Sequence, residues 1–272
     1  MTFYQRLQAR WTQTNSLVCV GLDPQPDLFP AQFRAHTQPI LAFNKAIIDA
    51  THDLVCAYKP QIAHYSALGA EDQLSATIDY IRTQHPDIPV LLDSKRGDIG
   101  STATLYARES FERYQADAVT VNPYMGWDTI EPFARHSEKG VIVLCRTSNP
   151  SAVELQNLFL TSGLPLFAQV ATNAAEHWNV HNNLALVVGA TAPDELAQVR
   201  AIVGTMPILV PGLGAQGGDT GAVMRAGLTP AGDGLIINSS RSVLYASNGD
   251  DFAQAARQET LALRDLTNGF RT

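Results

Sequence analysis

Short apolar segments recur along the whole chain and alternate with longer amphipathic stretches. There are eight such segments, at residues 17–22, 54–58, 88–92, 117–121, 140–145, 184–188, 207–210 and 233–237. Continuous apolar runs, rather than alternating ones, are typical of parallel strands that are covered on both faces. The stretches between them, such as 40–48, have the spacing of amphipathic helices. The pattern therefore predicts strands and helices in strict alternation.

The spacing of these segments predicts a closed barrel. Strand starts lie roughly 20 to 45 residues apart, which matches βα units. Eight units in about 250 residues favour a (β/α)8 TIM barrel over an open, doubly wound α/β sheet. No low-complexity linker or run of like charges divides the chain. We therefore expect one barrel domain over residues 1–272.

Composition and charge narrow the class of protein. The chain has 272 residues, of which 45% are hydrophobic, and a formal net charge of -7. This charge argues against nucleic acid or an anionic membrane as partner, because both attract cationic surfaces. No apolar stretch approaches 18 residues and the start of the chain lacks a signal-peptide pattern, so we expect a cytoplasmic protein. Cys19, Cys56 and Cys145 lie in apolar runs, which favours reduced core residues over disulfides.

Polar residues follow each apolar run. In a barrel of this kind the active site is built at the carboxyl ends of the strands, so these residues are the candidates for chemistry. In chain order they are Asp23, Lys59, residues 93–98, Asn122, residues 146–149, residues 189–191, residues 211–219 and residues 238–241.

The densest of these segments follows the third apolar run. The strand period of two places Asp93 and Lys95 on the same side, and Gly97 can turn the chain so that Asp98 opens the next helix. Lys59, at the end of the neighbouring strand, is expected beside Asp93. The pattern predicts an alternating array of ammonium and carboxylate groups in which a lysine can act as an acid. The alternative is a salt bridge at the barrel rim, with Asp98 as a helix cap.

The glycine-rich segment 211–219, after the seventh run, predicts a phosphate site together with Arg241. Glycines let backbone N–H groups approach an anion, and an arginine can donate two hydrogen bonds to phosphate. The segment also matches the dinucleotide fingerprint G-x-G-x-x-G, with Asp233 about 20 residues further on. That motif belongs in the first βα turn of a Rossmann fold, whereas here it falls in the seventh unit. A glycine loop without a ligand is the remaining alternative.

Three further features are weaker signals. Asp23 is placed to bind sugar hydroxyls, or serves only as the turn residue before Pro24. Residues 147–149 offer hydroxyl and amide groups that can read the edge of a heterocycle, or that simply form a turn. His177 and His181 are four residues apart without a third ligand nearby. We interpret them as a solvated helix face, and we expect no metal site.

Taken together, these residues resemble the orotidine 5′-phosphate decarboxylase family. The pattern Asp93-x-Lys95-x-x-Asp98-Ile99-x-x-Thr102, with Lys59, is similar to the catalytic signature of that family. The segments that match its longer-chain bacterial branch (type 2) over roughly residues 10–250 are 21–23, 58–61, 146–150, 211–219 and 238–241. Two places depart from the family pattern: residues 151–156 read Ser-Ala-Val-Glu-Leu-Gln where this branch is often rich in glycine and acid, and Arg241 follows Ser240 where the shorter branch has glycine.

The resemblance implies a carboxy-lyase that converts orotidine 5′-phosphate to UMP and CO2, the last step of de novo pyrimidine biosynthesis, without metal or organic cofactor. It implies that Lys95 protonates C6 of the pyrimidine, that Asp93 repels the substrate carboxylate, and that Lys59 and Asp98 complete the catalytic set. It also implies a homodimer in which Asp98 and Thr102 reach the neighbouring subunit's site. The substrate-binding residues that it implies are Asp23, Thr102, Ser148, Pro211, Gly212, Gln216 and Arg241.

Two other functions remain as alternatives. Sister enzymes, the sugar-phosphate decarboxylases and hexulose phosphate synthases, keep the D-x-K-x-x-D pattern but need Mg²⁺. A non-catalytic phosphate-sensing barrel keeps the glycine loop and Arg241. Such a sensor has no reason to keep Lys59, Asp93, Lys95 and Asp98 together.

Overall fold

The computed structural model describes residues 1–33, 35–213 and 219–271, which form eight parallel strands in one sheet. The order of the strands is β2-β1-β8-β7-β6-β5-β4-β3, and isolated parallel bridges from Tyr58 to Val90 and from Gln61 to Asp93 join its two ends. The strands are β1 (Val18–Leu22), β2 (Ala57–Pro60), β3 (Leu91–Arg96), β4 (Ala118–Val121), β5 (Gly140–Arg146), β6 (Leu184–Val188), β7 (Ile208–Pro211) and β8 (Leu235–Ser239). The sheet closes on itself, so the predicted (β/α)8 barrel is confirmed.

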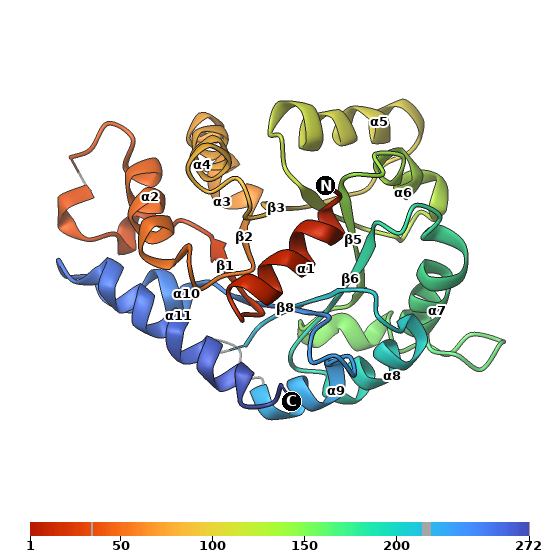
Figure 1. The fold of residues 1–272 in the computed structure, drawn as a ribbon. Helices are drawn as coiled ribbons and strands as arrows, with labels where there is room; N and C mark the ends of the chain where they lie inside the picture. Colours follow the sequence, from red (N-terminus) through yellow and green to blue (C-terminus); the bar gives the residue numbers. More distant parts are fainter. Residues whose placement is uncertain (34, 214–218, 272) are drawn as a thin grey trace.

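Helices form a ring outside the strands (Figure 1). The α-helices are α1 (Phe3–Gln13), α2 (Pro39–Thr51), α3 (Ile62–Ser66), α4 (Glu71–Gln84), α5 (Gly100–Arg108), α6 (Trp127–Ala134), α7 (Leu166–Asn173), α8 (Pro193–Val203), α9 (Thr220–Gly227), α10 (Arg241–Leu244) and α11 (Phe252–Asn268). The 3-10 helices are η1 (Pro26–Leu28), η2 (Ala31–Phe33) and η4 (Pro150–Glu154), and the π-helices are η3 (Glu109–Arg113) and η5 (Ala174–Trp178). Within the described ranges, no helix has the length and apolar character needed to cross a membrane.

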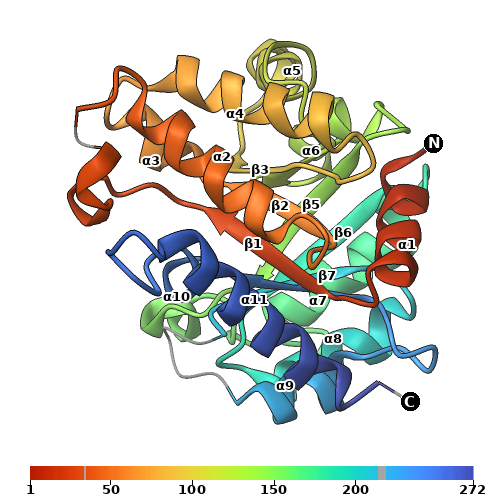
Figure 2. The ribbon, with the colours of Figure 1, turned by 60° about the vertical axis from the view of Figure 1, so that its left-hand side comes forward.

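Helix α1 covers the amino end of the barrel. It begins with a capping box, in which the Thr2 side chain accepts from the backbone N–H of Gln5 and the Gln5 side chain accepts from that of Thr2. Phe3 packs on Gly140 at the start of β5, where a Cβ atom would lie 2.3 Å from the phenyl ring. Only glycine fits at this contact. Figure 2 shows α1 at the end of the barrel from which β1 starts, with α10 at the opposite, carboxyl end.

Two strands begin three residues later than the apolar runs predict, and β8 begins two residues later, at 235. Strand β2 starts at residue 57 rather than 54, and β3 starts at 91 rather than 88 and continues to 96. Leu54 and Ile88 are 2% and 1% exposed although they precede the strands, because the chain packs beneath the barrel before it enters the sheet. An apolar run in the sequence shows that its residues are buried, but it does not show which of them pair with a neighbouring strand. Lys59 and Asp93 therefore lie within the strands and not after them.

Candidate active site

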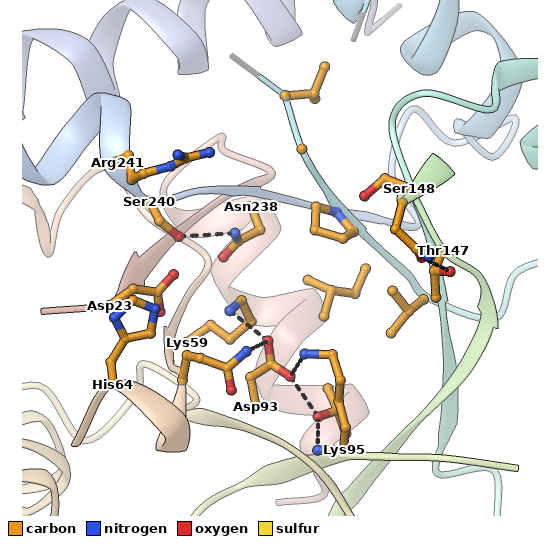
Figure 3. Close-up of a pocket in the computed structure, with 18 of the residues that line it drawn as sticks. Asp23, Lys59, His64, Asp93, Lys95, Thr147, Ser148, Asn238, Ser240 and Arg241 are labelled. Carbon is orange, nitrogen blue, oxygen red and sulfur yellow. Dashed lines mark hydrogen bonds and ion pairs between the residues drawn. The ribbon is translucent and has the colours of Figure 1, made fainter. Parts of the chain in front are cut away.

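A pocket of about 630 Å³ opens at the carboxyl end of the barrel, and each of the eight strands, or the segment directly after it, contributes to its lining. Figure 3 shows Lys59, Asp93 and Lys95 grouped on one side of this pocket. Ser148 and Arg241 lie on separate sides of the opening. Most of the polar residues predicted at the carboxyl ends of the strands therefore meet at this pocket, but Asn122 and Arg146 are not among the described residues that line it.

Asp93 is the centre of the hydrogen-bond network in the pocket. Its Oδ2 accepts from Nζ of Lys59 (3.0 Å) and from Nε2 of Gln61 (3.3 Å). Its Oδ1 accepts from Nζ of Lys95 (2.7 Å) and from the hydroxyl of Thr120 (2.8 Å). The carboxylate thus lies between two ammonium groups, as the sequence predicts. Gln61 lies in the segment 58–61 that matches the family but had no role assigned to it, and Thr120 was not selected by the sequence analysis.

The charges in this network shift the pKa values of its members. Burial alone would raise the pKa of Asp93, but the positive charges of Lys59 and Lys95 outweigh it and hold that pKa well below its usual range. Burial alone would lower the pKa of Lys59, and the negative charges of Asp93 and Asp23 reverse this and raise it above its ordinary value. Both groups are therefore charged at neutral pH.

Lys59 and Lys95 differ in how far their side chains are exposed to solvent. The Lys59 side chain is 4% exposed, whereas that of Lys95 is 44% exposed although it holds the same carboxylate. Lys95 has a φ of 49°, in the left-handed region that non-glycine residues rarely adopt. The chain therefore turns at Lys95. Gly97, where the sequence predicted the turn, has no such φ, and its missing side chain instead lets Asn122 approach to 3.3 Å of the Cβ position.

Asp98 and Thr102 lie apart from this group. In the described part of the chain, neither residue is among those that line the pocket. The expectation that Asp98 opens the helix is wrong by two residues, because α5 begins at Gly100 and the Asp98 carboxylate accepts from the neighbouring N–H of Ile99 (2.8 Å). Thr102 lies in the first turn of α5.

The predicted phosphate end of the pocket is described in part. Pro211, Gly212 and Arg241 line the pocket, and Arg241 is the first residue of α10. Gly212 has a φ of 99°, a conformation that favours glycine. Asp219 caps α9 by accepting from the N–H of Ala222 (3.1 Å). Gln216 lies outside the described residues.

The predicted base-reading segment forms the wall at the end of β5. Ser148 packs against Gly189 after β6, where a Cβ atom would lie 2.7 Å from that of Ser148. Gln156 accepts from the backbone N–H of Thr147 (2.8 Å) and donates to the Thr147 hydroxyl (2.8 Å). Gln156 belongs to the segment that departs from the family pattern, and its polar side chain holds the wall in place.

Two buried acceptors in the pocket are unpaired in the part of the chain that the structure describes. Oδ1 of Asp23 and Oδ1 of Asn238 are buried and have no hydrogen-bond partner among the described residues. Tyr245 fixes the segment that carries Asp23, because its hydroxyl donates to the Asp23 carbonyl (3.1 Å) and accepts from the N–H of Gln25 (2.7 Å). Buried acceptors without partners in a pocket are typical of ligand contacts. Asn238 was visible as a polar residue at the end of the eighth run, but only the structure shows its unpaired oxygen.

Comparisons with known proteins identify the family. A model of the orotidine 5′-phosphate decarboxylase / HUMPS family matches residues 16–257. The orotidine 5′-phosphate decarboxylase of Cellvibrio japonicus is 61% identical over 270 residues, 98% of each chain, and that of Azoarcus sp. is 56% identical over 271 residues, 100% of each chain. The structure of Leishmania donovani OMP decarboxylase is 40% identical with a TM-score of 0.86, and the match covers 100% of this chain and 99% of that one.

The two curated relatives match this chain over at least 98% of each length and are both named orotidine 5′-phosphate decarboxylase. The predicted carboxy-lyase is therefore confirmed in preference to the sister enzymes and the phosphate sensor. The chain belongs to the orotidine 5′-phosphate decarboxylase family.

Proposed function

We propose that Lys95, Asp93 and Lys59 carry out the decarboxylation of orotidine 5′-phosphate to UMP and CO2 in this pocket. The observation that supports this assignment is the Asp93 carboxylate held between two ammonium groups, of which only that of Lys95 is substantially exposed. Loss of CO2 leaves an anion at C6 of the pyrimidine. Lys95 stabilises that anion and protonates it.

Asp93 acts on the other side of the same step. Its negative charge lies beside the site of the departing carboxylate and disfavours the substrate more than the transition state. Two unit charges 4 Å apart interact by about 4 kcal/mol at an effective dielectric constant of about 20. Enzymes lower barriers by about 8–23 kcal/mol, so these charges supply only a part.

The remaining stabilisation comes from the distant parts of the nucleotide. Arg241 and Gln216 hold the phosphate, together with the backbone at Pro211 and Gly212. Binding energy at the phosphate favours the closed, desolvated arrangement in which the reaction occurs. Asp23 and Lys59 hold the ribose hydroxyls, for which the unpaired Oδ1 of Asp23 supplies a buried acceptor. Ser148 binds the pyrimidine edge.

The direct test is to incubate the protein with orotidine 5′-phosphate in excess EDTA and to follow the pyrimidine absorbance. We expect complete conversion to UMP, with the same rate in EDTA and in Mg²⁺. The matched control is Lys95→Ala under the same conditions. A rate that disappears in EDTA and returns with Mg²⁺ would contradict the metal-independent mechanism and favour a sister-enzyme mechanism.

We further propose that the enzyme is a homodimer in which Asp98 and Thr102 complete the partner's site. The position of Asp98 outside its own pocket supports this arrangement. Lys95→Ala and Asp98→Ala homodimers should each be nearly inactive. Hybrid dimers contain one site with both lesions and one intact site, so random exchange should restore about a quarter of wild-type activity. If mixtures that differential tags confirm as hybrid stay inactive, Asp98 acts within its own chain.

We also propose that the enzyme works in the cytosol, with no nucleic acid or membrane as partner. All three cysteines are buried and free. Burial raises the pKa of Cys145 to about 12, which keeps its thiol inert at neutral pH. Free core cysteines are typical of proteins from a reducing compartment.

A further inference from the structure

Thr120, in the middle of β4, has a hydroxyl group that is saturated with hydrogen bonds. It accepts from the backbone N–H groups of Ser94 (3.0 Å) and Lys95 (2.9 Å). It donates to Oδ1 of Asp93 (2.8 Å). Thr120 is 1% exposed. A threonine hydroxyl offers one donor and two acceptor positions, so this group is fully used by three consecutive residues of β3.

These three residues form the irregular part of β3. The pairing of β3 with β4 shifts between Leu92 and Arg96, so the intervening segment leaves the regular ladder of backbone hydrogen bonds. Within it, Lys95 adopts its left-handed φ of 49°. Such a conformation persists in a non-glycine residue only when the surroundings enforce it. The Thr120 hydroxyl provides that support, because it accepts from the N–H of Ser94, the residue before the turn, and from the N–H of Lys95 itself.

The same hydroxyl connects this backbone turn to the reacting charges. Oδ1 of Asp93 receives both the Thr120 hydroxyl and Nζ of Lys95 (2.7 Å). The Thr120 hydroxyl therefore holds the Lys95 backbone, from which the side chain starts. It also holds Oδ1 of Asp93, which accepts from the ammonium group at the end of that side chain.

We propose that Thr120 is a positioning residue for the decarboxylation, whose hydroxyl holds the Lys95 turn and the Asp93 carboxylate in the geometry that places the Lys95 ammonium at the reacting carbon. The proposal rests on the roles of Lys95 and Asp93 proposed above. Thr120 acts through these two residues, so its removal affects the chemical step more than the binding of the nucleotide.

The experiment compares Thr120→Val, which keeps the shape but loses the hydroxyl, with Thr120→Ser, which keeps the hydroxyl. Thr260→Val is the matched control, since Thr260 is 0% exposed and, among the described residues, its hydroxyl donates to a single group, the helix carbonyl of Ala256 (2.8 Å). We measure kcat and KM for orotidine 5′-phosphate and Kd for UMP. For Thr120→Val we expect kcat to fall about 10- to 100-fold, the effect of losing a hydrogen bond to a charged group, with KM and Kd within about threefold. Thr120→Ser and Thr260→Val should stay within about threefold of wild type in all three quantities.

Three results would overturn the proposal. The first is a kcat for Thr120→Val within threefold of wild type. The second is a loss in Thr120→Ser as large as in Thr120→Val, which would assign the effect to packing of the methyl group. The third is a loss of UMP affinity that matches the loss of kcat, which would indicate a collapsed pocket. If Thr120→Val does not fold, Thr120→Ala carries the same comparison.

Failure of the proposed function is recognised separately. It appears as a wild-type protein that does not convert orotidine 5′-phosphate, or as a Lys95→Ala variant that still does. A fully active wild type, an inactive Lys95→Ala and an unaffected Thr120→Val would refute the role of Thr120 alone.

Discussion

The two ends of the barrel both bury charged groups, but they use them differently. At the amino end, Arg200 of α8 is 9% exposed, and its guanidinium donates to four backbone carbonyls, those of Gly227 (2.7 Å), Gly204 (2.7 Å), Met206 (2.7 Å) and Gly234 (2.8 Å). Burial lowers its pKa to about 10. All of these hydrogen bonds go to the backbone of the same chain. They join α8 to the segments that lead into β7 and β8.

At the carboxyl end the pairing is incomplete. Lys95 holds Asp93 with a side chain that is 44% exposed. Oδ1 of Asp23 and Oδ1 of Asn238 are buried without a partner in the described part of the chain. Leaving buried polar atoms unpaired costs stability. Atoms such as Nε of Arg10 and Oδ1 of Asn183 are also unpaired in the described part of the chain, but Asp23 and Asn238 line the pocket, where a ligand can supply the missing partner.

The contrast teaches that burial of a charge does not by itself mark an active site. The useful signal is whether a charged group of the network, or an unpaired polar atom beside it, also faces a pocket, as Lys95, Asp23 and Asn238 do. This distinction predicts that removing a charge at the carboxyl end costs activity, whereas removing one at the amino end costs stability.

The largest effect is expected for Lys95→Ala. A general acid contributes about 10²- to 10⁴-fold, so kcat should fall by at least about 100-fold. The affinity for UMP should stay within a few fold, because the ammonium is assigned to the reacting carbon and not to the phosphate or ribose. Steady-state kinetics and a UMP titration measure the two quantities. A smaller fall in kcat would mean that another group donates the proton.

Arg200→Met should show the opposite behaviour. It leaves four backbone carbonyls without their donor, which should lower the free energy of unfolding by about 3 kcal/mol. The kcat of the folded fraction should stay close to wild type. Urea denaturation gives the stability, and kinetics at a temperature well below the transition give the activity. A stable variant with reduced kcat would remove the distinction between the two ends.

The sequence predicts the fold better than it predicts these contacts. Eight apolar runs were enough for the barrel, because burial on both faces of a strand demands continuous hydrophobicity. Arg200 gave no signal, since an arginine in an amphipathic helix looks like a surface residue and its carbonyl partners have no sequence signature. Thr120 gave a weak signal for a polar role, because it is the one hydroxyl residue in the apolar run 117–121.

The site was predicted where side-chain chemistry alone determines it. Lys59, Asp93 and Lys95 meet as expected, because parallel strands bring their carboxyl ends together. The turn was misplaced at Gly97, since glycine is the usual residue for a left-handed φ. At Lys95 this conformation is accompanied by a hydrogen bond from its N–H to the hydroxyl of Thr120 on the neighbouring strand, which we propose supports it. Such a dependence on another strand cannot be read from local sequence.

Arg241→Ala tests the exposed counterpart of Arg200. Without the guanidinium, kcat/KM for orotidine 5′-phosphate should fall about 10- to 100-fold, the effect of losing charge-assisted hydrogen bonds to phosphate. The free energy of unfolding should change by no more than about 0.5 kcal/mol, as for other exposed residues. The control substrate is orotidine, which lacks the phosphate. An equal loss for both substrates would place Arg241 elsewhere in the mechanism.

The smallest effect concerns the pH dependence of stability. Against the opposing effect of burial, Lys59 and Lys95 hold the pKa of Asp93 below its usual range. A group whose pKa is lowered on folding contributes stability that is fully present above its unfolded-state pKa, about 3.9 for aspartate. That contribution is lost as the pH falls through the lower, folded-state value.

Urea denaturation of wild type and Asp93→Asn between pH 6 and pH 3 isolates this contribution, since the other carboxyl groups are common to both proteins. The stability difference between them should be constant down to about pH 5 and should then shrink by about 1 kcal/mol at pH 3, because only the unfolded wild-type chain takes up the extra proton. The ion pair between Asp93 and Lys59 is buried. The change should therefore persist in 0.5 M salt, where ion pairs exposed to solvent are screened. A difference that stays constant down to pH 3 would mean that the two lysines do not stabilise the Asp93 carboxylate, and the array would then not supply the charge that the mechanism requires.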